Sequence, residues 1–283
     1  MKTALLLPDE EAIRVRVRHV AEPALGLGEA QVEIACLSHC PPDVRARDAR
    51  EPGVVWLGGF RSDMTGTKAQ AMVATAAACG SASVRFDYSG HGASSGSFRE
   101  GTISRWTREA LTVLREATHG RQVLVGSSMG AWVALRAVQA LQAAGEGDRV
   151  AGLLLIAPAP DFTSRLMEPA FDETRRAALA RDGHFLEPTP YSDEPNIITR
   201  ALIEDGRTCT VLDDPPVAGV PVRILQGMAD PDVPHTHAME LMEALVHDDV
   251  TMTLVRDGDH RLSREEDIAL LERTIVQVLD EVR

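Results

Sequence analysis

A serine flanked by two glycines is the clearest chemical signal in this sequence. Residues 123–132 read VLVGSSMGAW, so an apolar run precedes a Gly-x-Ser-x-Gly motif centred on Ser128, and a helical pattern follows it. At a strand-to-helix junction this motif predicts a nucleophile elbow, a turn so tight that side chains at Gly126 and Gly130 would clash. The alternative is a glycine-rich turn with an incidental serine, which the order of strand, motif and helix disfavours.

A serine hydroxyl becomes nucleophilic only beside a base, which an acid orients, and in such folds the chain order is Ser, acid, His. Residues 222–230, VRILQGMAD, predict a strand and a turn that end in Asp230. Asp232 is a competing acid, and we favour Asp230 because it comes first after the strand. Residues 251–255 predict the last strand, and His260 ends the loop after it. We expect His260 to remove the Ser128 proton and Asp230 to orient the imidazole.

The oxyanion that forms when serine attacks a carbonyl needs backbone N–H donors. One is the amide of Met129, the residue after the nucleophile, and the other should lie in the loop after an earlier strand. That loop, residues 57–64, reads LGGFRSDM, and we assign its donor to Phe60. The glycines before Phe60 permit close approach to a substrate, although an ordinary tight turn would also use them.

Other polar residues near the predicted strand ends are expected to have structural roles. Arg85 and Asp87 are expected to tie loops together rather than do chemistry. His91 has no matching acid and nucleophile, so we interpret it as structural. Arg61 is interpreted as solvated or ion-paired, with contact to a substrate carboxylate as the alternative.

The elements that must position these residues follow a regular alternation. Short apolar runs predict strands buried on both faces at residues 54–57, 83–86, 122–125, 150–156, 222–225 and 251–255. Amphipathic patterns predict helices at residues 67–78, 104–117, 129–143, 235–245 and 264–282. This alternation places the chain in the α/β class, with a mostly parallel central sheet and helices on both faces.

The core of this fold is expected to comprise residues 53–160 and 217–283. Before it, residues 1–52 carry two alternating strands, at 12–18 and 31–35, and a connector from 41 to 53 that packs on the sheet.

Residues 161–216 interrupt the alternation, because they contain no clear buried strand. Helices are predicted there at 168–180 and 196–205, separated by proline-rich turns. A long insertion of this kind predicts a helical lid.

Composition limits the classes of partner and compartment. The formal net charge of −13 disfavours nucleic acid and anionic membranes as partners. No stretch is apolar enough to span a membrane, and residues 1–10 lack the apolar core of a signal peptide. These features predict a cytoplasmic protein.

The four cysteines predict reduced thiols rather than a disulfide framework. Cys36, His39 and Cys40 lie close in sequence, but no second pair with zinc spacing follows them, so we expect no metal. No other motif implies a cofactor.

Several of these motifs resemble one subgroup of the α/β-hydrolase superfamily, which includes a mitochondrial palmitoyl-protein thioesterase and acyl-glucuronide hydrolase and bacterial carboxylesterases. The resemblance extends over about residues 53–283. It rests on GGFRSDMTGTKA at 58–69, RFDYSGHG at 85–92, VGSSMG at 125–130, ALIEDGR at 201–207, QGMAD at 226–230 and DHR at 259–261. It implies the α/β-hydrolase fold and hydrolysis of esters or thioesters, with Ser128, Asp230 and His260 in the family's triad positions.

The leading hypothesis is therefore a serine hydrolase that cleaves small-molecule esters or acyl thioesters through an acyl-enzyme. The same triad acting on a lactone, an acyl-glucuronide or a carbon–carbon bond is one alternative, because pocket shape decides between these bonds. A catalytically silent α/β-hydrolase that binds a ligand is another. The oligomeric state has no signature in the sequence.

Overall fold

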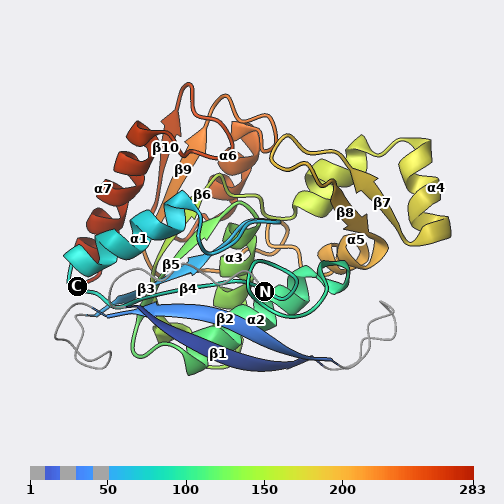
Figure 1. The fold of residues 1–283 in the computed structure, drawn as a ribbon. Coiled ribbons are helices and arrows are strands. Elements are labelled where there is room, and N and C mark those ends of the chain that lie inside the picture. The colour runs from blue at the N-terminus through green and yellow to red at the C-terminus, as the bar shows by residue number, and fades with distance from the viewer. Residues whose placement is uncertain (1–9, 20–29, 41–50) are drawn as a thin grey trace.

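The computed structural model describes residues 10–19, 30–40 and 51–283. Its centre is an eight-stranded sheet with the order β1-β2-β4-β3-β5-β6-β9-β10 (Figure 1). The strands are β1 (Glu10–His19), β2 (Ala30–His39), β3 (Gly53–Leu57), β4 (Ser83–Phe86), β5 (Gln122–Ser127), β6 (Val150–Ile156), β9 (Val222–Gly227) and β10 (Val250–Val255). β2 is antiparallel to β1 and β4, and the other neighbours are parallel, so the expected mostly parallel sheet is confirmed.

Helices cover both faces of this sheet (Figure 1). They are α1 (Thr67–Ala78), α2 (Ile103–Glu116), α3 (Met129–Ala143), α6 (His235–Ala244) and α7 (Glu265–Glu281). α1 and α7 share one hydrophobic cluster with the sheet, whereas α2, α3 and α6 share the other. The predicted helices differ from these only at their terminal residues. In the part of the chain that the structure describes, no helix is both long and apolar enough to cross a membrane.

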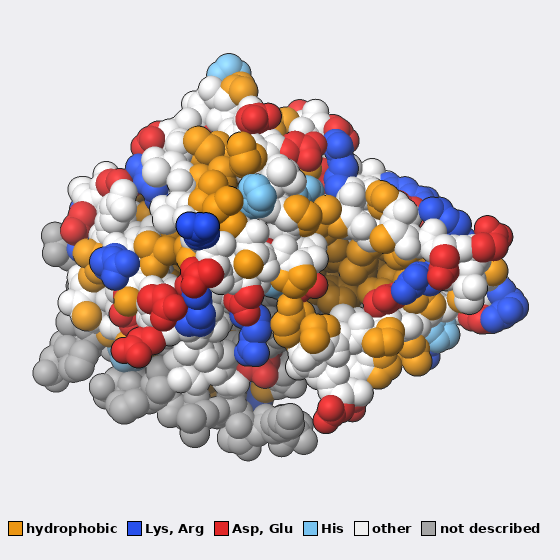
Figure 2. All heavy atoms as spheres, turned by 90° about the horizontal axis from the view of Figure 1, so that it is seen from above, with side chains coloured by type: hydrophobic (Ala, Val, Ile, Leu, Met, Phe, Trp, Pro, Cys, Tyr) orange, Lys and Arg blue, Asp and Glu red, His pale blue; other side chains and the backbone are white. Residues whose placement is uncertain are grey.

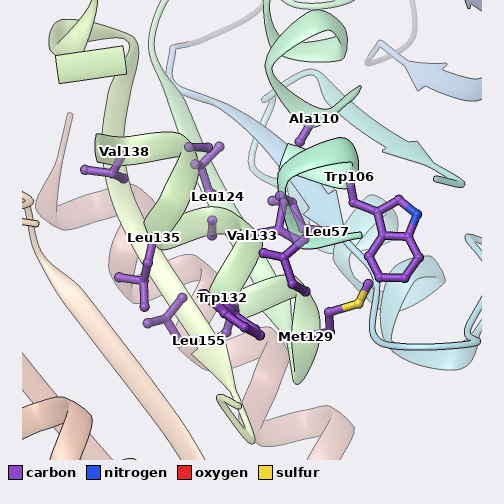
Figure 3. Packing of buried hydrophobic residues seen from close by; sticks show 14 of the residues in the cluster. Leu57, Trp106, Ala110, Leu124, Met129, Trp132, Val133, Leu135, Val138 and Leu155 are labelled. Atoms are coloured by element: carbon purple, nitrogen blue, oxygen red, sulfur yellow. The ribbon is translucent and has the colours of Figure 1, made fainter. Parts of the chain in front are cut away.

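Alternation along the central strands makes both faces of the sheet hydrophobic. In β3, Val54 and Trp56 belong to the cluster with α1 and α7, while Val55 and Leu57 belong to the opposite cluster. Successive side chains of a strand point to opposite faces, so a continuous apolar run is what a strand covered twice requires. The cluster that joins Leu57 to Val133 of α3 is shown in Figure 3.

β10 differs from the doubly buried strand that its apolar residues predicted. It ends the sheet and pairs only with β9 in the described structure. Its residues are half-buried or exposed, and Leu254 is 41% exposed. The prediction was wrong here because an apolar run does not reveal whether a strand has a neighbour on both sides.

The two N-terminal strands extend the main sheet at the β4 side. β1 and β2 are longer than the predicted segments 12–18 and 31–35, and β2 joins β4 with Cys36 opposite Phe86. The predicted loop between the two strands, and the connector up to residue 50, lie outside the described residues.

The segment 161–216 leaves the sheet after β6 and returns before β9. It contains α4 (Glu173–Asp182), α5 (Arg200–Gly206) and a separate antiparallel pair, β7 (His184–Glu187) and β8 (Asn196–Thr199). The helix predicted over 168–180 is divided into a short 3-10 helix, Glu168–Ala170, and α4, and the helix predicted over 196–205 is right only for its later residues. Asp172 caps α4 by accepting from the Arg175 amide, and Thr199 caps α5 by accepting from the Leu202 amide. These caps set the later starts.

Asp161 closes the two ends of this segment on each other. Its buried carboxylate accepts hydrogen bonds from the amides of Val211 and Leu212, each at 2.9 Å. Burial raises the pKa of Asp161, and those two amides oppose the increase. Residues 162–210 therefore leave and rejoin the sheet at one stem, and Phe162, Leu202 and Cys209 within them still belong to the main hydrophobic cluster.

Candidate active site

Ser128 lies between the end of β5 and the start of α3. Its backbone has φ 55° and ψ −117°, outside the regions that L-residues favour. The Ser128 amide donates to the Ile156 carbonyl of β6 at 2.8 Å, and the Ala131 amide donates to the Ser128 carbonyl at 3.0 Å. Hydrogen bonds on both sides thus hold the strained turn, and the tight strand-to-helix junction that the motif predicted is present.

The glycines on either side of this turn occupy positions where no side chain fits. A Cβ on Gly126 would lie 2.6 Å from the Gly130 carbonyl oxygen. A Cβ on Gly130 would lie 2.0 Å from the Leu57 carbonyl oxygen. Both obstacles are backbone atoms, so the clash is relieved only by moving α3 or β3.

We expect Gly130→Ala to lower the free energy of unfolding by about 4 kcal/mol or more, in the range of severe core substitutions. The added methyl group would push α3 away from β3. Gly147→Ala is a matched control, because its Cβ would meet only Gln142, with Cγ at 3.4 Å and Cα at 3.9 Å. Urea unfolding followed by circular dichroism measures both. Equal midpoints for the two variants would contradict the steric requirement at Gly130.

The His260 imidazole lies between the other two predicted residues. Its Nε2 is 3.1 Å from Ser128 Oγ, and its Nδ1 is 2.8 Å from Asp230 Oδ2. Because a carboxylate accepts, Nδ1 is assigned the proton, and Nε2 is then free to accept the serine hydroxyl hydrogen. The Asp230 side chain is fully buried, whereas the His260 side chain is 17% exposed. The structure therefore joins Ser128, His260 and Asp230 in one chain of hydrogen bonds.

Asp230 is surrounded by donors that keep it ionised. Its Oδ1 accepts from the amides of Asp232 at 2.9 Å and Val233 at 2.8 Å, and Oδ2 accepts from Gln226 Nε2 at 3.3 Å. Burial alone would raise the pKa of Asp230, but hydrogen bonds from His260 and these amides outweigh it and hold the pKa below its usual value. A carboxylate fixed in this way favours a protonated imidazole beside it.

Asp232, the competing acid, has a different partner. Its Oδ2 accepts from the hydroxyl of Tyr191 in the segment 161–216. Asp230, Asp232 and His260 do place possible metal-ligand atoms within 4.8 Å of one another, which no other group of described residues does. Hydrogen bonds already engage these three side chains, so the group needs no cation to satisfy it.

The predicted oxyanion donors lie next to the serine. A Cβ on Gly59 would be 3.5 Å from Ser128 Cβ, so the loop that continues into Phe60 runs beside the nucleophile. Met129 is the first residue of α3, and the first amides of a helix have no acceptor within the helix. The structure therefore brings Phe60 and Met129 near Ser128, and their donation to an oxyanion stays a prediction.

Asp87 and Arg85 tie loops together, as expected. The Asp87 carboxylate accepts from the amides of Met64 and Ala93, both at 2.7 Å. Arg85 Nη1 donates to the Met64 carbonyl at 2.6 Å. These bonds join the loop after β3 to the loop after β4, and they fix the position of the first loop beside Ser128.

Two contacts from the segment 161–216 to the site were missed by the sequence analysis. The Tyr191 hydroxyl donates to Asp232, and Glu194 pairs with Arg61 at 3.4 Å. Burial and the bond to Asp232 raise the pKa of Tyr191. The partners are 41 and 133 residues apart in sequence, and no local pattern links them. The expectation that Arg61 is ion-paired is confirmed.

Hydrophobic side chains surround the site where the core meets this segment. The Phe60 ring lies edge-on to Phe98 at 4.9 Å and to Phe162 at 5.9 Å between centroids. The segment contributes a cluster of Phe185, Ile198 and Ile203, with Phe60, Met167, Phe171, Ala178 and Leu179 packed against it. Figure 2 shows the surface hollowed at this side of the molecule, with hydrophobic side chains inside the hollow.

All four cysteines are free thiols, as expected. Burial is the main cause that raises the pKa of Cys36 to about 12, and it raises the pKa of Cys209 to about 12 as well. Protonated thiols are weak nucleophiles and weak metal ligands. Cys36 and Cys209 are therefore poor candidates for a nucleophile or a metal ligand.

Comparison with known proteins agrees with this geometry. Residues 52–272 match the model of the alpha/beta hydrolase family. The mitochondrial palmitoyl-protein thioesterase ABHD10 of mouse is 33% identical over 234 residues, covering 82% of this chain and 77% of the relative. A putative hydrolase from Agrobacterium vitis S4 has a similar structure, with 51% identity and a TM-score of 0.85 over 95% of this chain and 98% of that one. The structure of mouse alpha/beta hydrolase domain-containing protein 10 gives 28% identity and a TM-score of 0.79 over 96% and 100%.

The expected cytoplasmic location was wrong, since the mouse and human relatives are both named as mitochondrial. That expectation rested on the N-terminal pattern and on reduced cysteines, and free thiols suit any reducing compartment. The resemblance to the hydrolase subgroup is confirmed. With the fold, the family match and these relatives in agreement, the chain is a hydrolase and belongs to the α/β-hydrolase family.

Proposed function

We propose that this protein cleaves carboxylic esters or thioesters through an acyl-enzyme. The observation that carries the proposal is the position of His260, with Nε2 3.1 Å from Ser128 Oγ and Nδ1 2.8 Å from Asp230 Oδ2. Ser128 is then the nucleophile, His260 the general base and Asp230 the acid that orients it. The relatives named as thioesterases support an acyl substrate.

The reaction proceeds in two halves. His260 Nε2 takes the Ser128 proton as Oγ attacks the acyl carbon, and then returns it to the leaving oxygen or sulfur as that bond breaks. A water molecule next attacks the acyl-enzyme and gives its proton to Nε2, which passes it to Ser128 Oγ as the acid leaves. Asp230 stabilises the imidazolium in both halves, and the amides of Phe60 and Met129 donate to the oxyanion.

The segment 161–216 acts as a lid over an acyl-chain pocket in this proposal. Its cluster of Phe185 and Ile198 packs against Phe60, whose backbone runs beside Ser128. The Arg61–Glu194 ion pair holds the lid to the site, and Glu194 is 85% exposed. Exposed pairs of this kind contribute about 0–1 kcal/mol, so this ion pair adds little resistance to opening beyond the Tyr191–Asp232 bond and the packing on Phe60.

The test is a series of p-nitrophenyl esters from acetyl to palmitoyl, with matching acyl thioesters. We expect kcat/KM to rise about fourfold for each methylene that enters the pocket, from about 0.8 kcal/mol per buried CH₂, and to level off when the pocket is full. Absence of turnover on every ester and thioester would contradict the proposal. Labelling of Ser128 by a fluorophosphonate then separates an unreactive serine from an active enzyme with another substrate.

The lid is tested by Phe185→Ala beside Leu186→Ala. These neighbours of β7 face opposite ways, since Phe185 is 9% exposed and Leu186 is 59% exposed. We expect Phe185→Ala to lower kcat/KM for the palmitoyl thioester by about 30-fold, through about 2 kcal/mol of lost apolar contact, and to spare the acetyl ester. Leu186→Ala should match the wild type on both. Equal losses on both substrates would contradict an acyl-chain pocket at Phe185.

A further inference from the structure

We propose that His91 is a positioning residue for the oxyanion hole: it holds the backbone of Arg61 so that the neighbouring Phe60 N–H is aimed at the substrate oxygen. This inference rests on the proposed acyl transfer at Ser128. The sequence offered His91 neither acid nor nucleophile, and its partner is instead a main-chain amide. The Arg61 amide donates to His91 Nε2 at 3.2 Å.

Arg61 has an unfavourable backbone conformation at the point where this bond is made. Its φ of 60° lies in the left-handed region, which a residue with a Cβ adopts at a cost of about 1–2 kcal/mol. Such a conformation persists only where the surroundings enforce it. The Phe60–Arg61 peptide carries the Arg61 N–H, and only the φ and ψ of Phe60 separate this peptide from the Phe60 N–H. A bond that fixes the Arg61 N–H therefore restricts the direction of the Phe60 N–H as well.

The partners of His91 define one tautomer. Nδ1 lies 3.2 Å from the Ser89 carbonyl, which can only accept, so Nδ1 carries the hydrogen. Nε2 is then the acceptor that the Arg61 amide needs. A doubly protonated ring would carry a hydrogen on Nε2 as well, so Nε2 could not accept from the Arg61 N–H. Burial lowers the pKa of His91 to about 4, which keeps the ring in the accepting form at neutral pH.

A chain of contacts fixes the ring to the core. The Ser89 amide donates to the Glu109 carboxylate of α2 at 2.8 Å, and the Ser89 carbonyl also accepts from Trp106 Nε1 at 3.3 Å. The His91 ring lies edge-on to Phe98 at 5.0 Å and to Trp106 at 5.2 Å.

The same two rings also contact the side chain of Phe60, at 4.9 Å and 6.1 Å. Phe60 is therefore held twice, by its ring against Phe98 and Trp106 and by its peptide through His91. The adjoining Gly59 is in contact distance of Ser128, since a Cβ there would lie 3.5 Å from Ser128 Cβ. A fixed amide at this place is what a developing oxyanion requires, because donors that need no reorganisation stabilise it most.

The test compares His91→Phe with His91→Gln. Phenylalanine keeps a ring among Phe98 and Trp106 but removes the acceptor, whereas the glutamine amide oxygen can replace Nε2 as acceptor. The measurements are kcat and KM for the fastest ester of the acyl series and the Kd of an alkyl boronic acid. The tetrahedral adduct of the boronic acid with Ser128 mimics the oxyanion. Thermal melting reports on folding separately.

We expect His91→Phe to lower kcat by about 10- to 100-fold, less than the 10²–10³ lost when an oxyanion donor is removed outright. KM should stay within about twofold, and the boronate Kd should rise by the same factor as kcat falls. His91→Gln should recover most of the rate. An equal fall in kcat in both variants would contradict the positioning role. A rise in KM and a lower melting temperature with kcat unchanged would contradict it too, and would show that His91 only packs in the core.

The activity of the wild type shows whether the proposed function has failed or only the role of His91. If the wild type neither hydrolyses esters nor binds the boronate, the proposed function fails and the role of His91 fails with it. If the wild type is active and His91→Phe matches it, only the role of His91 fails. Should His91→Phe not fold, ¹⁵N NMR of the wild-type histidine ring still decides: protonation at Nε2 in neutral solution would overturn the bond to Arg61.

Discussion

Ser128→Ala is expected to lower kcat for ester hydrolysis by about 10⁵- to 10⁶-fold and to leave the fold intact. Loss of Oγ removes the atom that forms the acyl-enzyme and that lies 3.1 Å from His260 Nε2. Alanine has the same backbone constraints as serine at φ 55°, and Ser128 is only half-buried. The measurement is single-turnover and steady-state hydrolysis of the best ester in the acyl series.

Ser127→Ala is the matched control for this substitution. Ser127 precedes the nucleophile in the motif, belongs to β5 and is buried. It makes no contact with His260 among the hydrogen bonds of the described residues, so its rate should stay within a few-fold of the wild type, about 1 kcal/mol or less. A Ser128→Ala variant that keeps one per cent of the rate, about a 2.7 kcal/mol effect, would exclude covalent catalysis at this serine.

Asp230→Asn is the substitution with the next largest expected effect, a fall in kcat of about 10⁴-fold. An asparagine amide group opposite Nδ1 favours the tautomer with hydrogen on Nε2, which cannot accept the serine proton. The adjoining amides of Asp232 and Val233 can still bond to the asparagine oxygen, so the loop should keep its shape. KM should change little, because the substrate does not contact this buried group.

Asp232→Asn separates the two candidate acids. This side chain accepts from Tyr191, not from His260, so we expect kcat to fall by less than about tenfold, or 1.4 kcal/mol. Steady-state kinetics and melting temperatures of both variants make the comparison. If Asp232→Asn were the variant that loses the rate, the assignment of the orienting acid would have to be exchanged.

Ser128, Asp230 and His260 could be located from the sequence because each follows a short local pattern. β5 ends directly before Ser128, β9 ends at Gly227, three residues before Asp230, and β10 ends at Val255, five residues before His260. In parallel strands the carboxyl ends share one edge of the sheet, so residues that follow them meet there. Strand ends are thus enough to bring these side chains together without knowledge of other contacts.

Contacts between distant loops leave no such pattern. The bond from Arg61 to His91 has a main-chain donor, so no pair of complementary side chains announces it. His91 was interpreted as structural because the sequence offers it no matching acid and nucleophile. The strands β7 and β8 were missed as well, because His184–Glu187 and Asn196–Thr199 are short and, among the described residues, pair only with each other. Their extended conformation depends on pairing with each other in the folded chain more than on local sequence.

The stem at Asp161 has a consequence for how this enzyme diversifies. Because Asp161 joins the chain to Val211 and Leu212, the exposed part of the segment between them can change in length without changing the order or the register of the sheet strands, provided that Phe162, Leu202 and Cys209 keep their places in the core. Ser128, Asp230 and His260 all lie outside that segment. Under the proposed function, insertion, deletion or grafting in the exposed part of this segment would change which acyl groups enter while Ser128, Asp230 and His260 stay in place, so selectivity and chemistry can evolve at separate rates.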